Sequence, residues 1–267
     1  MKLFRLLDRA LVDYNFFIAF AAVSLLWLVD FQFDAQLQVA SYCFLFTSTL
    51  LTYNVFRTPY QSISHFWNNR NMRFYIVVGS GFVASICFLQ FEIGLQVMFV
   101  VLGFLTASYK FSFFKIPSLR EIPFLKLPVI TAVWVASIAI FLIHRPVNPA
   151  IYMEFQVLMY MQVFLFIAIT IPFDVFGLIE DDMPTIPNHF GTRKALLFSK
   201  IAILIYGMLP LIFGIERFLI PAISVTLITF GVIQFTEKLK DKAIQYYCLD
   251  GILIVQTLVY FLFQQDQ

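Results

Sequence analysis

The chain has 267 residues, of which 61% are hydrophobic and only 13% are charged. A soluble domain usually has about 25% charged residues, so this composition excludes a protein whose whole surface faces water. The net charge of +2 is too small, and the basic residues are too scattered, for a nucleic-acid-binding protein.

Nine apolar runs predict helices that cross a lipid bilayer. A run of about 20 mostly apolar residues is long enough to span the hydrocarbon core, and these runs lack the two-residue alternation of porin strands. In chain order, they cover about residues 10–29, 36–56, 74–91, 93–109, 125–143, 154–173, 195–214, 217–236 and 246–264. The sequence therefore predicts an all-α, multi-pass integral membrane protein. Because no Pro-, Gly- or Ser-rich linker divides the chain, we expect a single domain over residues 1–267.

The basic residues predict the orientation of this helix bundle. Lysine and arginine accumulate on cytoplasmic loops. With a cytoplasmic N-terminus and nine spans, all of the 18 lysines and arginines except Arg145 and Arg217 lie on the cytoplasmic side. That side also carries the long polar loops, at about residues 57–73, 110–124 and 174–194, where binding or chemistry is expected to concentrate.

An acidic block follows the sixth predicted helix. Asp174 and Asp181 are almost two helical turns apart and would share one face, and Glu180 and Asp182 add charge beside them. Carboxylates this close repel one another unless a cation or water relieves the repulsion. One interpretation is a Mg²⁺ ion shared with a phosphate. The other is a solvated acidic loop at a helix end, and the spacing leaves both open.

The region around this block resembles a known family of membrane enzymes. Residues 171–195, IPFDVFGLIEDDMPTIPNHFGTRKA, resemble the second aspartate-rich motif of the UbiA superfamily of intramembrane prenyltransferases. Residues 108–134 resemble the segment that joins that family's fourth and fifth spans. Nine helices and cytoplasmic active-site loops also match. Further matching positions are Thr185, Ile186, Pro187, Gly191 and Ala195 after the acidic block, Tyr53 and Asn54 at the end of the second span, and Asp250 and Gly251 in the last span.

The resemblance implies a function and a site. A UbiA-like protein transfers an isoprenyl group from a prenyl diphosphate to a lipophilic acceptor, in a central cavity that opens to the cytoplasmic leaflet. Its implied partners are a prenyl diphosphate or another lipid diphosphate and the lipid bilayer, its cofactor is Mg²⁺, and we expect it in a bacterial cytoplasmic membrane. The implied metal ligands are Asp174, Asp181 and Asp182, and the implied diphosphate-binding residues are Asn54, Arg57, Lys115 and Arg120.

The first metal-binding motif of the family is missing from this chain. Family members continue from the asparagine with aspartates, in the pattern N-D-x-x-D-x-x-x-D. When this pattern is placed on Asn54, the aspartate positions hold Val55, Thr58 and Ser62. Two other interpretations therefore stay open: a non-catalytic membrane protein with the same fold, and a carrier of lipids or small solutes.

Overall fold

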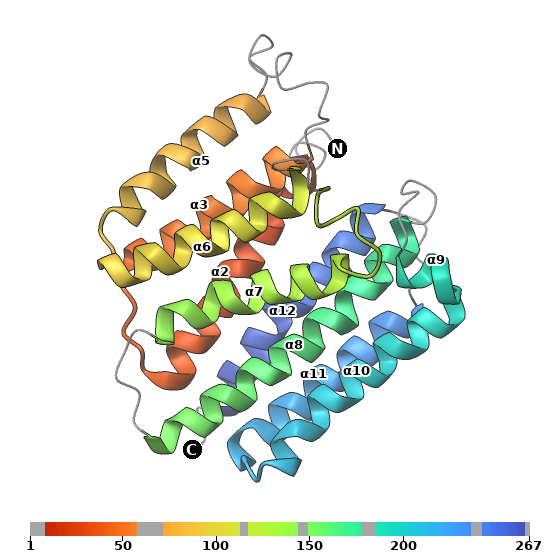
Figure 1. Cartoon of the computed structure of the whole chain (residues 1–267). Coiled ribbons are helices and arrows are strands. Elements are labelled where there is room, and N and C mark those ends of the chain that lie inside the picture. Colours follow the sequence, from red (N-terminus) through yellow and green to blue (C-terminus); the bar gives the residue numbers. More distant parts are fainter. Residues whose placement is uncertain are drawn as a thin grey trace. The chain divides into compact units, whose positions relative to one another are not determined.

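The computed structural model describes residues 9–57, 72–112, 117–143, 149–177, 185–235 and 242–264. Within these ranges every regular element is a helix, which confirms the predicted all-α class (Figure 1). The chain forms two compact units, Met1–Gln96 (unit 1) and Val97–Gln267 (unit 2), which we describe separately. The expectation of a single domain stays a prediction.

Unit 1 contains a short π-helix and three long helices. The π-helix η1 is Arg9–Asp13, and the long helices are α2 (Phe16–Phe33), α3 (Val39–Phe56) and α5 (Met72–Phe88). Helix α3 packs against both α2 and α5 (Figure 1). The small buried residues Ala19, Ala21 and Ala22 lie on α2, and small side chains let membrane helices approach closely.

Among the described residues, unit 2 contains seven helices, the first of which is α6 (Ile93–Lys110), whose first turn still belongs to unit 1. The others are α7 (Lys126–Ile143), α8 (Pro149–Gly177), α9 (Ile186–Phe190), α10 (Thr192–Ile212), α11 (Glu216–Phe235) and α12 (Lys242–Gln264). Helix α8 is the most buried of the candidate membrane spans and packs against α7, α10, α11 and α12. Helices α8, α10 and α11 lie side by side in Figure 1.

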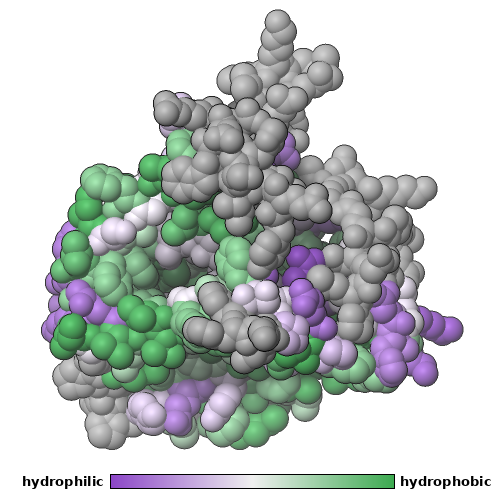
Figure 2. Space-filling model, turned by 45° about the horizontal axis from the view of Figure 1, so that its top comes forward, coloured by the Kyte–Doolittle hydropathy of each residue, from purple (hydrophilic) through white to green (hydrophobic). Residues whose placement is uncertain are grey.

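Eight helices of the described residues are long and apolar enough to cross a membrane, and the apolar α5 is slightly shorter. Large apolar side chains, including Phe82, Phe104 and Leu227, are exposed, and Figure 2 shows hydrophobic residues over much of one face. The chain is thus an integral multi-pass membrane protein, as its composition predicts. The predicted orientation in the membrane stays a prediction.

Two helix boundaries differ from the sequence-based expectation. Helix α2 begins at Phe16 rather than near residue 10, because Asn15 has a left-handed backbone (φ 64°) that separates η1 from α2. Helix α8 runs from Pro149 to Gly177 and so extends beyond both ends of the predicted 154–173 span.

The charged residues of α8 place it across the bilayer. Its two acidic residues, Glu154 and Asp174, form ion pairs with Arg217 and Lys126. They are separated by 20 positions, or about 30 Å along a helix, which is about the thickness of the hydrocarbon core. Between them α8 has no charged residue. We therefore expect each ion pair to lie near one edge of the hydrophobic part of unit 2.

Helices α10 and α11 approach closely at Gly207. A Cβ atom at this position would lie 2.4 Å from Thr226 Oγ1 and 3.2 Å from Thr226 Cβ. The Thr226 hydroxyl also donates a hydrogen bond to the carbonyl of Ile203 on α10, at 3.4 Å. Glycine at position 207 is therefore required for this helix contact.

We expect Gly207→Ala to lower the free energy of unfolding by about 1–3 kcal/mol, because the added methyl group overpacks the α10–α11 contact. Gly231→Ala on α11 is the matched control, since a Cβ there has no neighbour within 4 Å. Thr226→Ala should restore part of the lost stability in the Gly207→Ala background. Denaturant unfolding in detergent measures all four proteins, and equal losses for the two glycine substitutions would contradict the overpacking explanation.

Candidate functional site

The candidate site in unit 2 centres on Asp174, near the C-terminal end of α8. Lys126, the first residue of α7, lies with its Nζ atom 2.7 Å from Asp174 Oδ1. The side chain of Asp174 is 5% exposed and that of Lys126 is 18% exposed. Because the carboxylate is almost completely removed from water, loss of its cationic partner would leave a costly buried charge.

The packing of α7 against α8 fixes the position of this ion pair. The two helices are antiparallel, and Trp134 stacks on Phe166 with ring centroids 5.1 Å apart. Lys126 precedes Trp134 by eight residues, and Asp174 follows Phe166 by eight residues. Both charged groups therefore lie about two helical turns from the stacked rings, on the same side of them.

A contact between α8 and α10 supports the turn of helix that carries Asp174. Pro172 has no N–H to donate to the carbonyl of Ala168, four residues earlier. The buried Ser199 of α10 donates its hydroxyl to that carbonyl instead, at 2.5 Å. Helix α8 continues through Pro172 to Gly177, so Asp174 remains on a helix.

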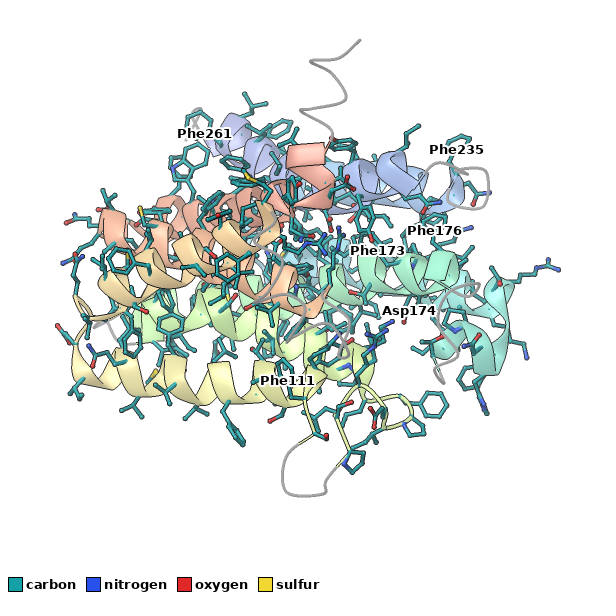
Figure 3. The ribbon with its side chains drawn as sticks, turned by 90° about the horizontal axis from the view of Figure 1, so that it is seen from above. Phe111, Phe173, Asp174, Phe176, Phe235 and Phe261 are labelled. Carbon is teal, nitrogen blue, oxygen red and sulfur yellow. The ribbon has the colours of Figure 1, made fainter. Side chains whose placement is uncertain are left out.

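Aromatic residues lie next to Asp174 along α8 (Figure 3). Phe173 packs against Tyr246 of α12 with ring centroids 5.5 Å apart. Figure 3 labels Phe173, Asp174 and Phe176 on the same part of α8. Side chains one and two positions apart on a helix point in directions about 100° and 200° apart, so these rings lie on other faces of α8 than the carboxylate. This end of α8 therefore has a charged group on one face and apolar rings on others.

Several predicted site residues of this region are outside the described residues: Lys115, Asp181 and Asp182. Arg120 is described, and its backbone N–H donates to the carbonyl of Tyr109 at 3.2 Å, so the segment after α6 folds back on the end of that helix. The predicted grouping of these residues with Asp174 stays a prediction.

The described residues do not by themselves make a Mg²⁺ site. Among them, no three His, Cys, Asp or Glu side chains lie together in a way that could hold a metal ion. Asp174 is the one predicted metal ligand that is described, and its carboxylate binds Lys126. A complete metal site would need ligands from Asp181 and Asp182.

Unit 1 contains the other two predicted diphosphate-binding residues. Asn54 is fully buried, and its side-chain amide donates to the carbonyls of Tyr14 at 2.9 Å and Leu50 at 2.8 Å. Arg57 Nη1 donates to the carbonyl of Val12 at 2.9 Å. Both side chains therefore hold the backbone between η1 and α2.

Arg73 of α5 contributes to the same backbone contact. Its Nη2 atom donates to the carbonyl of Asp13 at 3.1 Å. Three side chains from two helices thus bind the consecutive carbonyls of residues 12, 13 and 14, where η1 ends and the helical hydrogen-bond pattern is interrupted. We call these three side chains the carbonyl clamp. From the sequence alone, Arg73 is one of the basic residues of the cytoplasmic side, and no motif indicates this role.

The sequence alone does not identify the partner of Asp174. Lys126 is one of the basic residues assigned there to the cytoplasmic side, and the general excess of positive charge on that side accounts for it. Lys126 begins the predicted 125–143 span and Asp174 follows the predicted 154–173 span. Consecutive antiparallel spans bring such ends to the same side of the membrane, so these positions are compatible with the pair.

Comparison with known proteins gives no family for this chain. No protein-family model, curated protein or solved structure matches it. The relation to the UbiA superfamily remains an expectation based on residues 171–195 and 108–134.

We expect Ser199→Ala to lower the free energy of unfolding by about 1–2 kcal/mol, because it leaves the Ala168 carbonyl without a donor inside the membrane. In a Pro172→Ala background, position 172 regains an N–H that can bond to this carbonyl. The same serine substitution should then cost clearly less. A double-mutant cycle of unfolding free energies measures the difference, and an equal cost in both backgrounds would contradict this role of Ser199.

The carbonyl clamp predicts a structural role for Asn54. Asn54→Ala removes two hydrogen bonds from buried carbonyls and should lower the free energy of unfolding by about 1–3 kcal/mol. Asn188→Ala, at an exposed position of α9, is the control and should have little effect. Thermal unfolding without any added diphosphate tests this prediction. Unchanged stability of the Asn54 variant would show that the clamp contributes nothing to folding.

Proposed function

We propose that this protein is a UbiA-like membrane prenyltransferase homologue that binds a prenyl diphosphate with its charged head at the Asp174 end of α8. The observation that supports this proposal best is the buried ion pair between Lys126 and Asp174, 2.7 Å apart. It lies at the edge of the hydrophobic part of unit 2, where a lipid diphosphate has its own boundary between head and tail.

Lys126 provides the positive charge for this binding. An ammonium group has three N–H donors, so it can bind a carboxylate and a phosphate oxygen together. Phe173, Phe176 and Tyr246 are apolar residues at the same end of α8 and on α12, and we assign to them the contacts with the first isoprene units. Asp174 holds the ammonium in place, because it is almost completely buried on a helix.

In an active enzyme, the bond between C1 of the prenyl chain and the diphosphate oxygen breaks. The oxygen keeps the electron pair, a nucleophilic atom of the acceptor forms the new bond to C1, and the acceptor releases a proton. A fixed cation near the departing diphosphate lowers the barrier, because negative charge grows there. This is the contribution that we assign to Lys126. A bound Mg²⁺ ion would supply further positive charge to the phosphates.

The same ion pair supports a second candidate, a non-catalytic relative that binds the lipid diphosphate without turnover. The described carboxylate of the proposed site already has a lysine partner. The sequence also has Val55, Thr58 and Ser62 in place of the aspartates of the first family motif. Both features reduce the capacity of the chain to hold metal ions.

Binding and turnover assays on the same sample distinguish these candidates. The purified protein in lipid nanodiscs is titrated with farnesyl diphosphate, with and without Mg²⁺, and diphosphate release is measured with a mixture of lipophilic acceptors. Binding with release supports the enzyme, and binding without release supports the non-catalytic relative. Absence of binding across several prenyl chain lengths would refute the proposal.

We expect Lys126→Met to weaken farnesyl diphosphate binding at least tenfold, which corresponds to about 1.4 kcal/mol. Lys194→Met is the matched control, because Lys194 is exposed in the first turn of α10 and tests the general effect of one positive charge. Equal weakening by both substitutions would argue against a specific phosphate contact.

The charge exchange Lys126→Asp with Asp174→Lys separates binding from folding. It can restore an ion pair between α7 and α8 and should recover much of the stability lost in Lys126→Asp alone. It moves the cation to a different helix, so binding should stay weak. Full recovery of binding would contradict the proposed contact between Lys126 and the diphosphate.

A further inference from the structure

Unit 2 contains a buried hydrogen-bonded group far from the Lys126–Asp174 pair. Gln256 Nε2 on α12 donates to Tyr206 Oη on α10 at 3.0 Å, and Tyr206 Oη donates to Tyr260 Oη at 3.4 Å. All three side chains are fully buried. The Gln256 Oε1 atom accepts no hydrogen bond from the described residues. One acceptor of this group is therefore unused.

A second glutamine with unused hydrogen-bonding atoms lies on α8. Gln162 is fully buried, and neither its Nε2 atom nor its Oε1 atom has a partner among the described residues. Gln162 is eight residues from Glu154 and twelve from Asp174, or about 12 Å and 18 Å along α8. Because those two residues mark the edges of the hydrophobic part of unit 2, Gln162 lies near mid-membrane.

Two contacts show that Gln162 and the group around Gln256 lie at the same depth. The hydrogen bond between Ser199 and the Ala168 carbonyl aligns the antiparallel helices α8 and α10. Gln162 precedes Ala168 by six residues on α8, and Tyr206 follows Ser199 by seven residues on α10. Because the helices are antiparallel, both displacements have the same direction across the membrane, and each is about 10 Å along its helix.

The aromatic contact between Phe173 and Tyr246 gives the same result for α8 and α12. From it, Gln162 is eleven residues along α8 and Gln256 is ten residues along α12, both about 15–17 Å. Eleven residues are about three helical turns, so Gln162 and Phe173 share the face of α8 that packs on α12. Gln162 thus lies at about the same depth as the hydrogen-bonded group of Tyr206, Gln256 and Tyr260, and we call these four residues the polar layer.

The unused atoms of the polar layer define the chemistry of a ligand. They include the amide donor of Gln162 and the carbonyl oxygens of Gln162 and Gln256. Hydrocarbon cannot satisfy such atoms, which makes their burial in the membrane costly. A hydroxyl group complements them, because its oxygen accepts one hydrogen bond while its hydrogen donates another. The layer contains no carboxylate, lysine or arginine, so a neutral group fits it best.

We propose that the polar layer binds the hydroxyl group of a neutral lipophilic alcohol or phenol near mid-membrane. Gln162 Nε2 donates to the ligand oxygen, and the ligand hydroxyl donates to Gln256 Oε1. The site uses neither Lys126 nor Asp174, so it does not depend on the proposed prenyl diphosphate binding.

Photolabelling in lipid nanodiscs tests this site with the full-length protein. The probe is a long-chain alcohol with a diazirine in its chain, and the matched probe has hydrogen in place of the hydroxyl group. We expect saturable labelling of α8, α10 and α12 by the alcohol probe, with the modified peptides identified by mass spectrometry. Unlabelled long-chain alcohol should compete with the probe, and the corresponding alkane should not.

Gln162→Leu should reduce this labelling at least tenfold. Gln156→Leu is the matched control, since it makes the same change on another face of α8 at a partly exposed position. Equal labelling by both probes, or labelling unaffected by Gln162→Leu, would overturn the proposal and indicate a layer that holds only water. If Gln162→Leu does not fold, the comparison of alcohol and alkane competitors on the unmodified protein still decides the question.

Discussion

The hydrocarbon core offers no hydrogen-bond partners, and this constraint accounts for the main features of the structure. The described residues satisfy it mostly with helices, and two interruptions of the helical pattern recruit side chains. At the η1–α2 junction, the carbonyl clamp of Asn54, Arg57 and Arg73 binds three consecutive carbonyls. At Pro172, the carbonyl that loses its helical donor accepts the hydroxyl of Ser199. Polar residues in predicted spans are therefore often structural, even where a family pattern suggests ligand binding.

The hydrocarbon core also restricts where charged residues occur in unit 2. Glu154 and Asp174 occur where α8 reaches the two edges of the membrane, and each has a basic partner on another helix. The pair at Asp174 is the more informative one, because it is the more deeply buried of the two. Both candidate functions depend on whether its ammonium group also binds phosphate.

Much of the fold could be predicted from the sequence, because long apolar runs identify membrane helices regardless of tertiary contacts. The start of α2 could not, since the left-handed backbone at Asn15 interrupts an apolar run that continues in the sequence, and the carbonyls beside it bind side chains from distant parts of the chain. The candidate site was predicted less well. The acidic block drew attention to Asp174, but charge patterns alone do not distinguish a metal ligand from an ion-pair partner. Gln162 has no charge and fits no motif, so the contacts of three helices were needed to recognise it.

The hydroxyl of Ser199 has a consequence for how unit 2 can change shape. It joins α10 to the backbone of α8, and a backbone carbonyl cannot rotate away as a side chain can. A slide of α8 along α10 by one turn would break this bond and leave the carbonyl in hydrocarbon. The two helices should therefore move as one rigid pair, and any rearrangement of unit 2 should keep α8 and α10 in register.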